Sequence, residues 1–458
     1  MTALLLLAGL AAGGLLVGLV AARHPNMAAM ILLFAMFFRQ SLPEVAGLSP
    51  LLPAILGVVL ATVLHVVGNG GRTPKLGLLE GLIVLYVAWN LISLAWPQAA
   101  DGWAPGPQAP LPVWRFILTG IATPLVLYVV GRICFRTHEH ARLLLWATLA
   151  FGAFSAFVSI GQFHAPGLVW PRYIVEEPNW TGRANGVPNQ PVVNGLILIA
   201  GYLVAMAIAS RTEINRVLRG GAVLIAAASA YSVYLTHTRA VWAAFLIVTV
   251  LGAAWMRRAR PQFVAVLMVM VLAVGVGWST FTSSDRDAGG VGSEGEVDDR
   301  LNLIATQVWA FQQEPLLGWG IGTFPTINVY HHKQFSNDVQ WVRGYAVASH
   351  ENELGILVEL GLVGLVLWLA ILVAIWTRAR RTVRAADDEH VEDQPFAVVA
   401  LLMFVALLLA GLTVDLRYFD FINALTFLML GTAAGVGEAA RATSSADAGR
   451  ASEPVPVR

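Results

Sequence analysis

The chain has 458 residues, of which 57% are hydrophobic and only 12% are charged, with a formal net charge of +1. Soluble domains carry about 25% charged residues, so this composition excludes an ordinary soluble protein and indicates a polytopic membrane protein. The single cysteine, Cys134, excludes an intrachain disulfide and a multi-cysteine metal or iron–sulfur site. The chain has no G-x-x-x-x-G-K-[ST] motif, which argues against nucleotide hydrolysis as an energy source.

About thirteen apolar runs follow one another along the chain, each bounded by charged residues or by Pro and Gly. Such runs predict membrane-spanning helices and an all-α fold. The first run has no preceding Lys or Arg, unlike a secretory signal, so we expect a retained helix. The second is short enough to be tilted or half inserted, which leaves twelve spans as the alternative to thirteen. The predicted spans lie near residues 2–21, 27–39, 50–67, 78–96, 112–134, 141–163, 190–210, 219–236, 240–256, 262–280, 352–376, 396–415 and 419–437.

Lys and Arg are distributed unequally between the two ends of the predicted spans. One set of alternate connections, together with the C-terminal tail, holds 19 of the 29 basic residues. The positive-inside rule places this set in the cytoplasm, because cytoplasmic loops of membrane proteins are enriched in Lys and Arg. The remaining ten fall on the opposite, outer side against that rule, so we expect them to have a specific purpose. They are Arg39, Arg115, Arg172, Arg183, Arg239, Arg286, Arg300, Lys333, Arg343 and Arg417.

The chain is expected to form one integral membrane domain over residues 1–438, with two long outer loops at about 164–189 and 281–349. The first loop is rich in Pro, Gly, Asn and Trp, which is typical of an ordered irregular loop. In the second, an amphipathic helix capped by Asp298 or Asp299 and ended by Pro315 is expected to lie on the membrane surface. Residues 439–458 lack an apolar period and predict a disordered cytoplasmic tail. The predicted apolar stripe of the amphipathic helix comprises Leu301, Ile304, Ala305, Val308 and Phe311.

A polar segment joins directly to an apolar helix in SHENELGILVELGLVG, residues 349–364. This arrangement puts His350 at a membrane surface, where it is a candidate acid or base. On a helix Glu353 shares the face of His350 whereas Glu359 lies on the opposite face, so Glu353 or another helix must orient the imidazole ring. The alternative interpretation is that Ser349 and the acidic residues only cap the helix N-terminus.

Three arginines on the predicted outer face, Arg183, Arg239 and Arg300, come from separate segments at the level of the lipid headgroups. Guanidinium groups bind phosphate oxygens bidentately and stay charged, so a lipid phosphate or diphosphate is the expected ligand. Arg239 is the strongest candidate because a span begins at it with almost no loop. The alternative is that these arginines only contact headgroups or acidic loop residues. Metal ligands are poorly represented, since His331 and His332 are the closely spaced outer histidines, and we expect no metal and no cofactor.

Four motifs occur in order along residues 180–375. They are GRANGVPNQP followed by LTHTRAVWAAF, then R-x-x-L with EPLLGWGIGTF, and then H-x-x-x-L-x-x-x-x-E-x-G-x-x-G. In this order and topology the chain resembles the bacterial O-antigen ligase and O-antigen polymerase superfamily. The flanking regions resemble it only by hydropathy.

The resemblance implies a GT-C type glycosyltransferase that moves a glycan from undecaprenyl diphosphate to an acceptor hydroxyl. The acceptor would be the lipid A core oligosaccharide or a growing glycan, on the periplasmic side of the bacterial inner membrane, without metal or nucleotide sugar. On matching positions Arg239 and Arg300 would hold the diphosphate, Arg183 would assist, and His350 would act at the acceptor. The family usually has Asn directly after this His, whereas this chain has Glu351. Further candidates for a supporting role are Glu353, Asn352, Arg172 and Arg417.

Two alternatives to a ligase remain at this point. A polymerase of the same superfamily shares these motifs. A polysaccharide transporter or flippase also needs many spans and buried charge, but transporters place ionisable groups near the bilayer midplane. Here the spans are almost free of charge and the polar groups gather at one end, which favours an enzyme whose site opens at the membrane surface. The partners that the resemblance implies are membrane lipids and a lipid-linked glycan. No nucleic acid partner is expected.

Overall fold

The computed structural model describes residues 24–42, 49–68, 74–96, 112–283, 295–339, 347–389 and 394–451. Within these ranges the regular structure is entirely helical. Nine of the described helices are long and apolar enough to cross a membrane, and three shorter apolar helices cover residues 25–37, 239–255 and 395–411. These helices coincide with twelve of the predicted spans, which confirms the all-α, polytopic fold. The span predicted near residues 2–21 lies outside the described residues.

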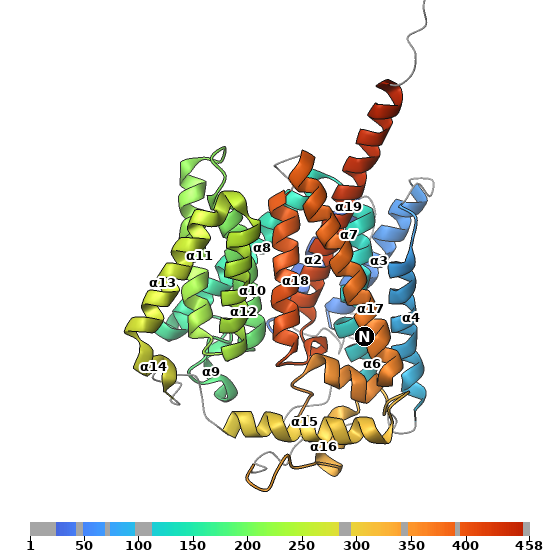
Figure 1. The fold of residues 1–458 in the computed structure, drawn as a ribbon, viewed down its shortest axis with the longest axis vertical. Coiled ribbons are helices and arrows are strands. Elements are labelled where there is room, and N and C mark those ends of the chain that lie inside the picture. Colours follow the sequence, from blue (N-terminus) through green and yellow to red (C-terminus); the bar gives the residue numbers. More distant parts are fainter. Residues whose placement is uncertain are drawn as a thin grey trace, which may run out of the picture.

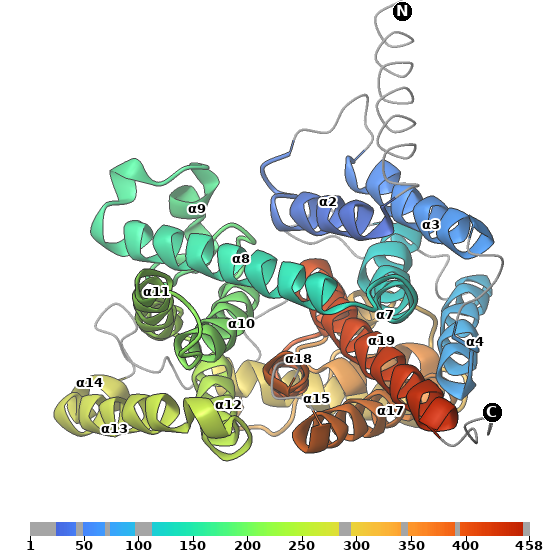
Figure 2. The same ribbon diagram turned by 90° about the horizontal axis from the view of Figure 1, so that it is seen from above.

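Two groups of helices make up the bundle, and α18 (Gln394–Gly411) packs against members of both (Figure 2). The first group contains α8 (His138–His164), α9 (Tyr173–Glu176), α10 (Pro191–Ala209), α11 (Arg216–Leu235), α12 (Arg239–Trp255), α13 (Arg260–Val276) and α14 (Trp278–Thr282), with the short turns η3 (Pro166–Leu168), η4 (Pro178–Trp180) and η5 (Arg257–Ala259). The second group contains α2 (Pro25–Phe37), α3 (Leu51–Gly68), α4 (Leu78–Ile92), η1 (Ser93–Ala95), α6 (Val113–Phe116), η2 (Ile117–Ala122), α7 (Thr123–Cys134), α17 (Asn352–Glu389), η6 (Leu416–Tyr418) and α19 (Asp420–Ala451).

Close helix packing holds each group together. Every residue of α10 is buried, whereas Phe263 is the buried residue of α13, so α10 is central and α13 peripheral. In the second group α7 and α19 approach so closely that a Cβ atom at Gly431 would lie 2.0 Å from the carbonyl oxygen of Tyr128. Small residues permit such close contact between helix backbones. Helices in lipid associate by this kind of packing, because the surrounding lipid is as apolar as the helices and supplies no hydrophobic driving force.

A buried ionic network joins four helices of the second group at one end of the bundle. Arg132 of α7 contacts Glu80 of α4 at 2.6 Å and Glu438 of α19 at 3.0 Å, and Arg378 of α17 contacts Glu438 at 2.7 Å. Buried charges require such pairing, because an unpaired charge in a low-dielectric interior is very costly. The network therefore fixes the end of α17 that lies far from His350.

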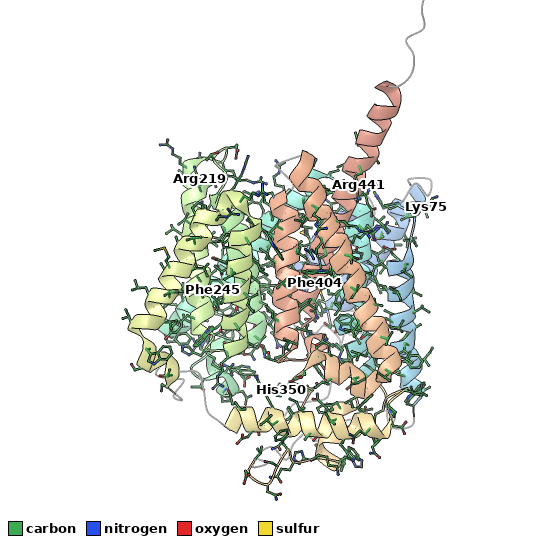
Figure 3. The ribbon with its side chains drawn as sticks, viewed as in Figure 1. Lys75, Arg219, Phe245, His350, Phe404 and Arg441 are labelled. Carbon is green, nitrogen blue, oxygen red and sulfur yellow. The ribbon has the colours of Figure 1, made fainter. Side chains whose placement is uncertain are left out.

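The two ends of the bundle differ as the charge distribution predicts. Lys75, Arg219 and Arg441 lie at one end, and His350 lies at the other (Figure 3). The loop that carries α9 lies at the same end as His350 (Figures 1 and 3). The separation of the basic connections from the candidate site is thus a feature of the fold, whereas the assignment of these ends to cytoplasm and periplasm stays a prediction.

Helix α15 (Gly295–Gln313) crosses the end of the bundle, roughly perpendicular to the spans, and α16 (Phe324–Tyr330) lies beside it (Figure 1). The predicted amphipathic helix is therefore present, but two details were wrong. It begins at Gly295, so Asp298 and Asp299 lie inside the helix instead of capping it. Its buried face includes Asn302, Leu303 and Thr306, whereas Val308 of the predicted stripe is 46% exposed.

The C-terminal segment also differs from its prediction. Helix α19 continues to Ala451, so residues 439–451 are helical where the sequence predicted a disordered tail. The segment EAARATSSADAGRA is rich in Ala, the residue with the highest helix propensity, and it continues a long, well-packed helix without a new nucleation step. Residues 452–458 lie outside the described part of the chain.

Candidate active site

The turn that carries His350 is held by hydrogen bonds to the residue before it. The side-chain amide of Gln307, on α15, donates to the hydroxyl of Ser349 at 2.6 Å. The same hydroxyl accepts from the amide of Glu351 at 3.2 Å and donates to the carbonyl of Glu351. Ser349 therefore does organise the turn before α17, as the capping interpretation proposed. Because α15 supplies the third bond, the turn is also fixed to the helix that crosses the end of the bundle.

Asn352 and Glu353, the first two residues of α17, bind to residues elsewhere in the chain. Asn352 is fully buried, and its side-chain oxygen accepts from the amide of Leu416 at 3.2 Å while its nitrogen donates to Glu353 at 3.1 Å. The carboxylate of Glu353 also accepts from the indole of Trp368 at 3.4 Å. Asn352 thus anchors the connection between α18 and α19 to the start of α17. These two predicted supporting residues hold the frame around His350.

Arg417 forms a buried ionic triad below this turn. Its guanidinium lies 2.6 Å from Glu359 of α17 and 2.6 Å from Asp415, and the exposed fraction of its side chain is 5%. A guanidinium between two carboxylates is satisfied in charge and in hydrogen bonding. The ion pair of Arg417 with Glu359 therefore supports the site by joining η6 to the first part of α17. This pairing explains why Glu359, an acidic residue, lies inside an otherwise apolar run.

The apolar run that starts at Asn352 is broken at Gly361, where φ is +65° and ψ is −169°. The sequence predicted one continuous span, so this break is a correction. The Gly-rich loop of residues 315–320 binds across the break and satisfies backbone groups that a broken helix leaves open. Its hydrogen bonds join Trp319 to Val358 (3.0 Å), Gly320 to Glu359 (2.8 Å), Leu362 to Pro315 (2.9 Å) and Val363 to Leu316 (3.4 Å).

A second part of the site is the junction between the loop after α9 and the start of α12. We call residues 182–184 together with residues 235–239 the arginine junction. The guanidinium of Arg183 donates to the hydroxyl of Thr238 at 2.8 Å and to the carbonyl of Thr236 at 3.4 Å. Thr238 is the N-cap residue of α12, and Arg239 is its first residue. Two of the three predicted phosphate-binding arginines are therefore brought to one turn.

The arginine junction is rigidly connected to its neighbours. The amide of Ala184 donates to the carbonyl of Leu235 at 2.9 Å, and Gln162 of α8 donates to the carbonyl of Arg183 at 2.9 Å. Arg183 also stacks over the ring of Trp180, with 5.4 Å between its guanidinium carbon and the ring centroid. The backbone on both sides of Arg183 is thereby fixed before any ligand binds, which is the preorganisation that anion binding favours.

The third predicted arginine, Arg300, lies on α15 and is exposed, as is Arg239. Burial raises the pKa of the half-buried Glu351 carboxyl above its usual value, and the charge of Arg300 opposes that rise while Glu353 adds to it. Helix α15 thus carries Arg300 and also Gln307, whose side chain holds the histidine turn.

Arg172 belongs to a different arrangement. Its guanidinium contacts Glu176 at 3.1 Å and the carbonyls of Pro166 and Val169, so it braces the loop between α8 and α9. Among the described residues, no group of three or more His, Cys, Asp or Glu side chains is arranged to hold a metal ion.

Some important contacts could not be read from the sequence. No sequence pattern predicted that Gln307 contacts Ser349, because the two residues are far apart along the chain. Glu359 and Arg417 were each recognisable as a charged residue next to an apolar span, but the sequence did not predict that they pair with each other.

Comparison with known proteins covers the centre of the chain. Residues 221–369 match a protein-family model described as O-Antigen ligase. This region starts within α11 and ends within α17, so it contains Arg239, Arg300 and His350, while Arg183 precedes it. No curated protein matches the chain.

Proposed function

We propose that this multi-pass membrane protein is an O-antigen ligase-like glycosyltransferase, and the match of residues 221–369 to the O-Antigen ligase family model supports this proposal. It transfers a glycan from undecaprenyl diphosphate to a hydroxyl of the lipid A core oligosaccharide, on the periplasmic side of the inner membrane. The observation that carries this proposal is the hydrogen bond between Arg183 and Thr238, which brings two arginines to one turn at the end of the bundle where His350 lies.

The arginines bind the diphosphate of the donor. Two adjacent phosphate groups carry several negative oxygens, and planar guanidinium groups from Arg183 and Arg239 fit that geometry better than a point charge. Arg300 contributes from α15. As the bond between the sugar carbon and the phosphate oxygen breaks, negative charge grows on the leaving diphosphate, and the fixed arginines stabilise it. Stabilisation of developing charge is usually the largest single contribution to catalysis.

His350 acts at the acceptor. Its neutral imidazole takes the proton from the acceptor hydroxyl while that oxygen attacks the anomeric carbon of the donor sugar. The new glycosidic bond forms, the bond to the diphosphate breaks, and the electron pair leaves with undecaprenyl diphosphate. General-base catalysis of this kind contributes about 10² to 10⁴ in rate. The bonds of Ser349 to Gln307 and Glu351 support this role because they fix the turn that carries the ring.

Deletion of the gene distinguishes this function from that of a polymerase. A ligase deletion leaves long glycans stranded on the lipid carrier, because polymerisation continues without transfer. A polymerase deletion leaves single repeat units on the carrier. Accumulation of single units, with transfer to the lipid A core retained, would replace the ligase assignment by the polymerase of the same superfamily.

A further inference from the structure

His237 lies at the centre of the arginine junction, between Thr236 and Thr238, and its backbone is in the left-handed region with φ of +42°. Residues other than glycine seldom adopt positive φ, although His, Asn and Asp do so more often than others. A bulky residue held there signals that the surrounding structure fixes it, and such positions concentrate at functional sites.

The side chain of His237 forms a hydrogen bond to the other segment of the arginine junction, residues 182–184. Its Nδ1 lies 2.6 Å from the carbonyl oxygen of Gly182. A carbonyl oxygen only accepts hydrogen bonds, so Nδ1 must carry the proton and donate it. This bond joins the residue before Arg183 to the residue two positions before Arg239, so one imidazole connects the backbones that present both arginines.

Aromatic side chains hold the imidazole in place. The rings of Phe163, Tyr234 and Trp242 surround it edge to face, with interplanar angles of 88°, 84° and 86°. Trp242 is itself fixed, because its indole donates to the carbonyl of Val233 at 3.1 Å. His237 is 5% exposed, so the ring is buried within this set.

We propose that His237 is a positioning residue that sets the separation and direction of Arg183 and Arg239 for a diphosphate. This inference rests on the proposed function of the junction. His237 does not contact the substrate; it acts through Gly182 on one arginine and through the turn at Thr238 on the other. Two guanidinium groups fixed in this way suit two linked phosphate groups better than one, so His237 confers preference for a diphosphate over a monophosphate.

The experiment measures binding of undecaprenyl diphosphate and of undecaprenyl monophosphate to the full-length protein in lipid nanodiscs. Asn places a donor where Nδ1 lies and tolerates positive φ, whereas Gln places its donor near Nε2 and Leu has none. We expect His237→Gln and His237→Leu to weaken diphosphate binding about tenfold, the equivalent of one lost hydrogen bond, with unchanged stoichiometry and a reduced preference over the monophosphate. His237→Asn keeps binding within about threefold of the wild type by the same reasoning.

The exposed His164, whose Nε2 lies 2.8 Å from the hydroxyl of Tyr231 at the same end of the bundle, provides the matched control. His164→Ala leaves both dissociation constants unchanged. A purely structural role would lower the amount of active protein without changing the dissociation constant. Wild-type binding by both His237→Gln and His237→Leu overturns the inference, and so does failure of all three His237 variants, Asn included, to fold. If Arg183→Lys and Arg239→Lys also bind normally, the proposed function fails instead.

Discussion

The side-chain amide of Gln307 donates a 2.6 Å hydrogen bond to the hydroxyl of Ser349, and so the helix across the end of the bundle holds the residue before His350. These residues belong to different elements, α15 and the turn before α17. The bond makes the position of a proposed catalytic base depend on a helix that also carries Arg300. Movement of α15 would therefore change the base and the phosphate site together.

Replacement of Gln307 by Leu removes this bond at nearly constant volume. We expect kcat for glycan transfer to fall about threefold to tenfold, since one hydrogen bond to a buried hydroxyl is lost. The exposed Gln312 of the same helix serves as the control, and Gln312→Leu keeps the wild-type rate. Equal rates for the two variants would show that the Gln307 bond does not position His350.

Arg239→Lys and Arg300→Lys each lose most transfer activity while the protein remains inserted and folded. Lys keeps the positive charge but cannot offer the planar fork that binds two phosphate oxygens. Arg258, which pairs with Glu213 in a connection on the opposite side, is the control, and Arg258→Lys retains activity. Near-normal transfer by both Arg239→Lys and Arg300→Lys would show that these two arginines only contact lipid headgroups.

His350→Gln and His350→Ala are each reduced at least about a hundredfold, with the lipid-linked donor still bound, if His350 is the base. Gln keeps hydrogen-bonding capacity but cannot accept the proton. In the wild type kcat falls as the pH is lowered, because protonation removes the neutral imidazole. Transfer rates of purified enzyme across pH test this. A His350→Gln variant with a near wild-type rate would show that His350 only positions the substrate and that the arginines supply most of the catalysis.

Glu351 provides a prediction on stability and pH. Burial raises the pKa of its carboxyl, so folding favours the protonated form. The charged form therefore destabilises the folded state at neutral pH, and this penalty disappears as the pH falls below the usual carboxyl pKa of about 4.3. Glu351→Gln should raise the melting temperature at pH 7 and give a smaller gain toward pH 4. A gain that is the same at both pH values would contradict the burial of this group.

Gly361→Ala tests the break in α17. An added Cβ atom would lie 2.2 Å from the carbonyl oxygen of Leu316, and the residue would keep a positive φ. We expect destabilisation of at least about 1 to 3 kcal/mol and low yield of folded protein. Gly220 lies in α11 with no atom within 4 Å of an added Cβ, so Gly220→Ala is tolerated. Thermal unfolding in detergent compares the two, and equal stability would mean that α17 can run through Gly361 unbroken.

The sequence by itself determined the number and order of the described spans, because burial in lipid demands long apolar helices whatever their partners. It also determined which end of the bundle carries most basic residues, since Lys and Arg counts are local facts. Arg183, Arg239, Arg300 and His350 stood out because each charge or polar group lies beside hydrocarbon, where it is costly.

Only the tertiary structure decided how these residues are held. The bonds of Arg183 to Thr238, Gln307 to Ser349 and Arg417 to Glu359 join residues 55, 42 and 58 positions apart, and no periodicity specifies such partners. The same reason explains the errors. On the buried face of α15, the side chain of Asn302 accepts a hydrogen bond from the amide of Phe335, and that of Thr306 accepts one from the amide of Lys333. The break at Gly361 is bound by a loop that begins at Pro315. Each depends on a distant segment that satisfies a backbone or side-chain group, which sequence hydropathy does not record.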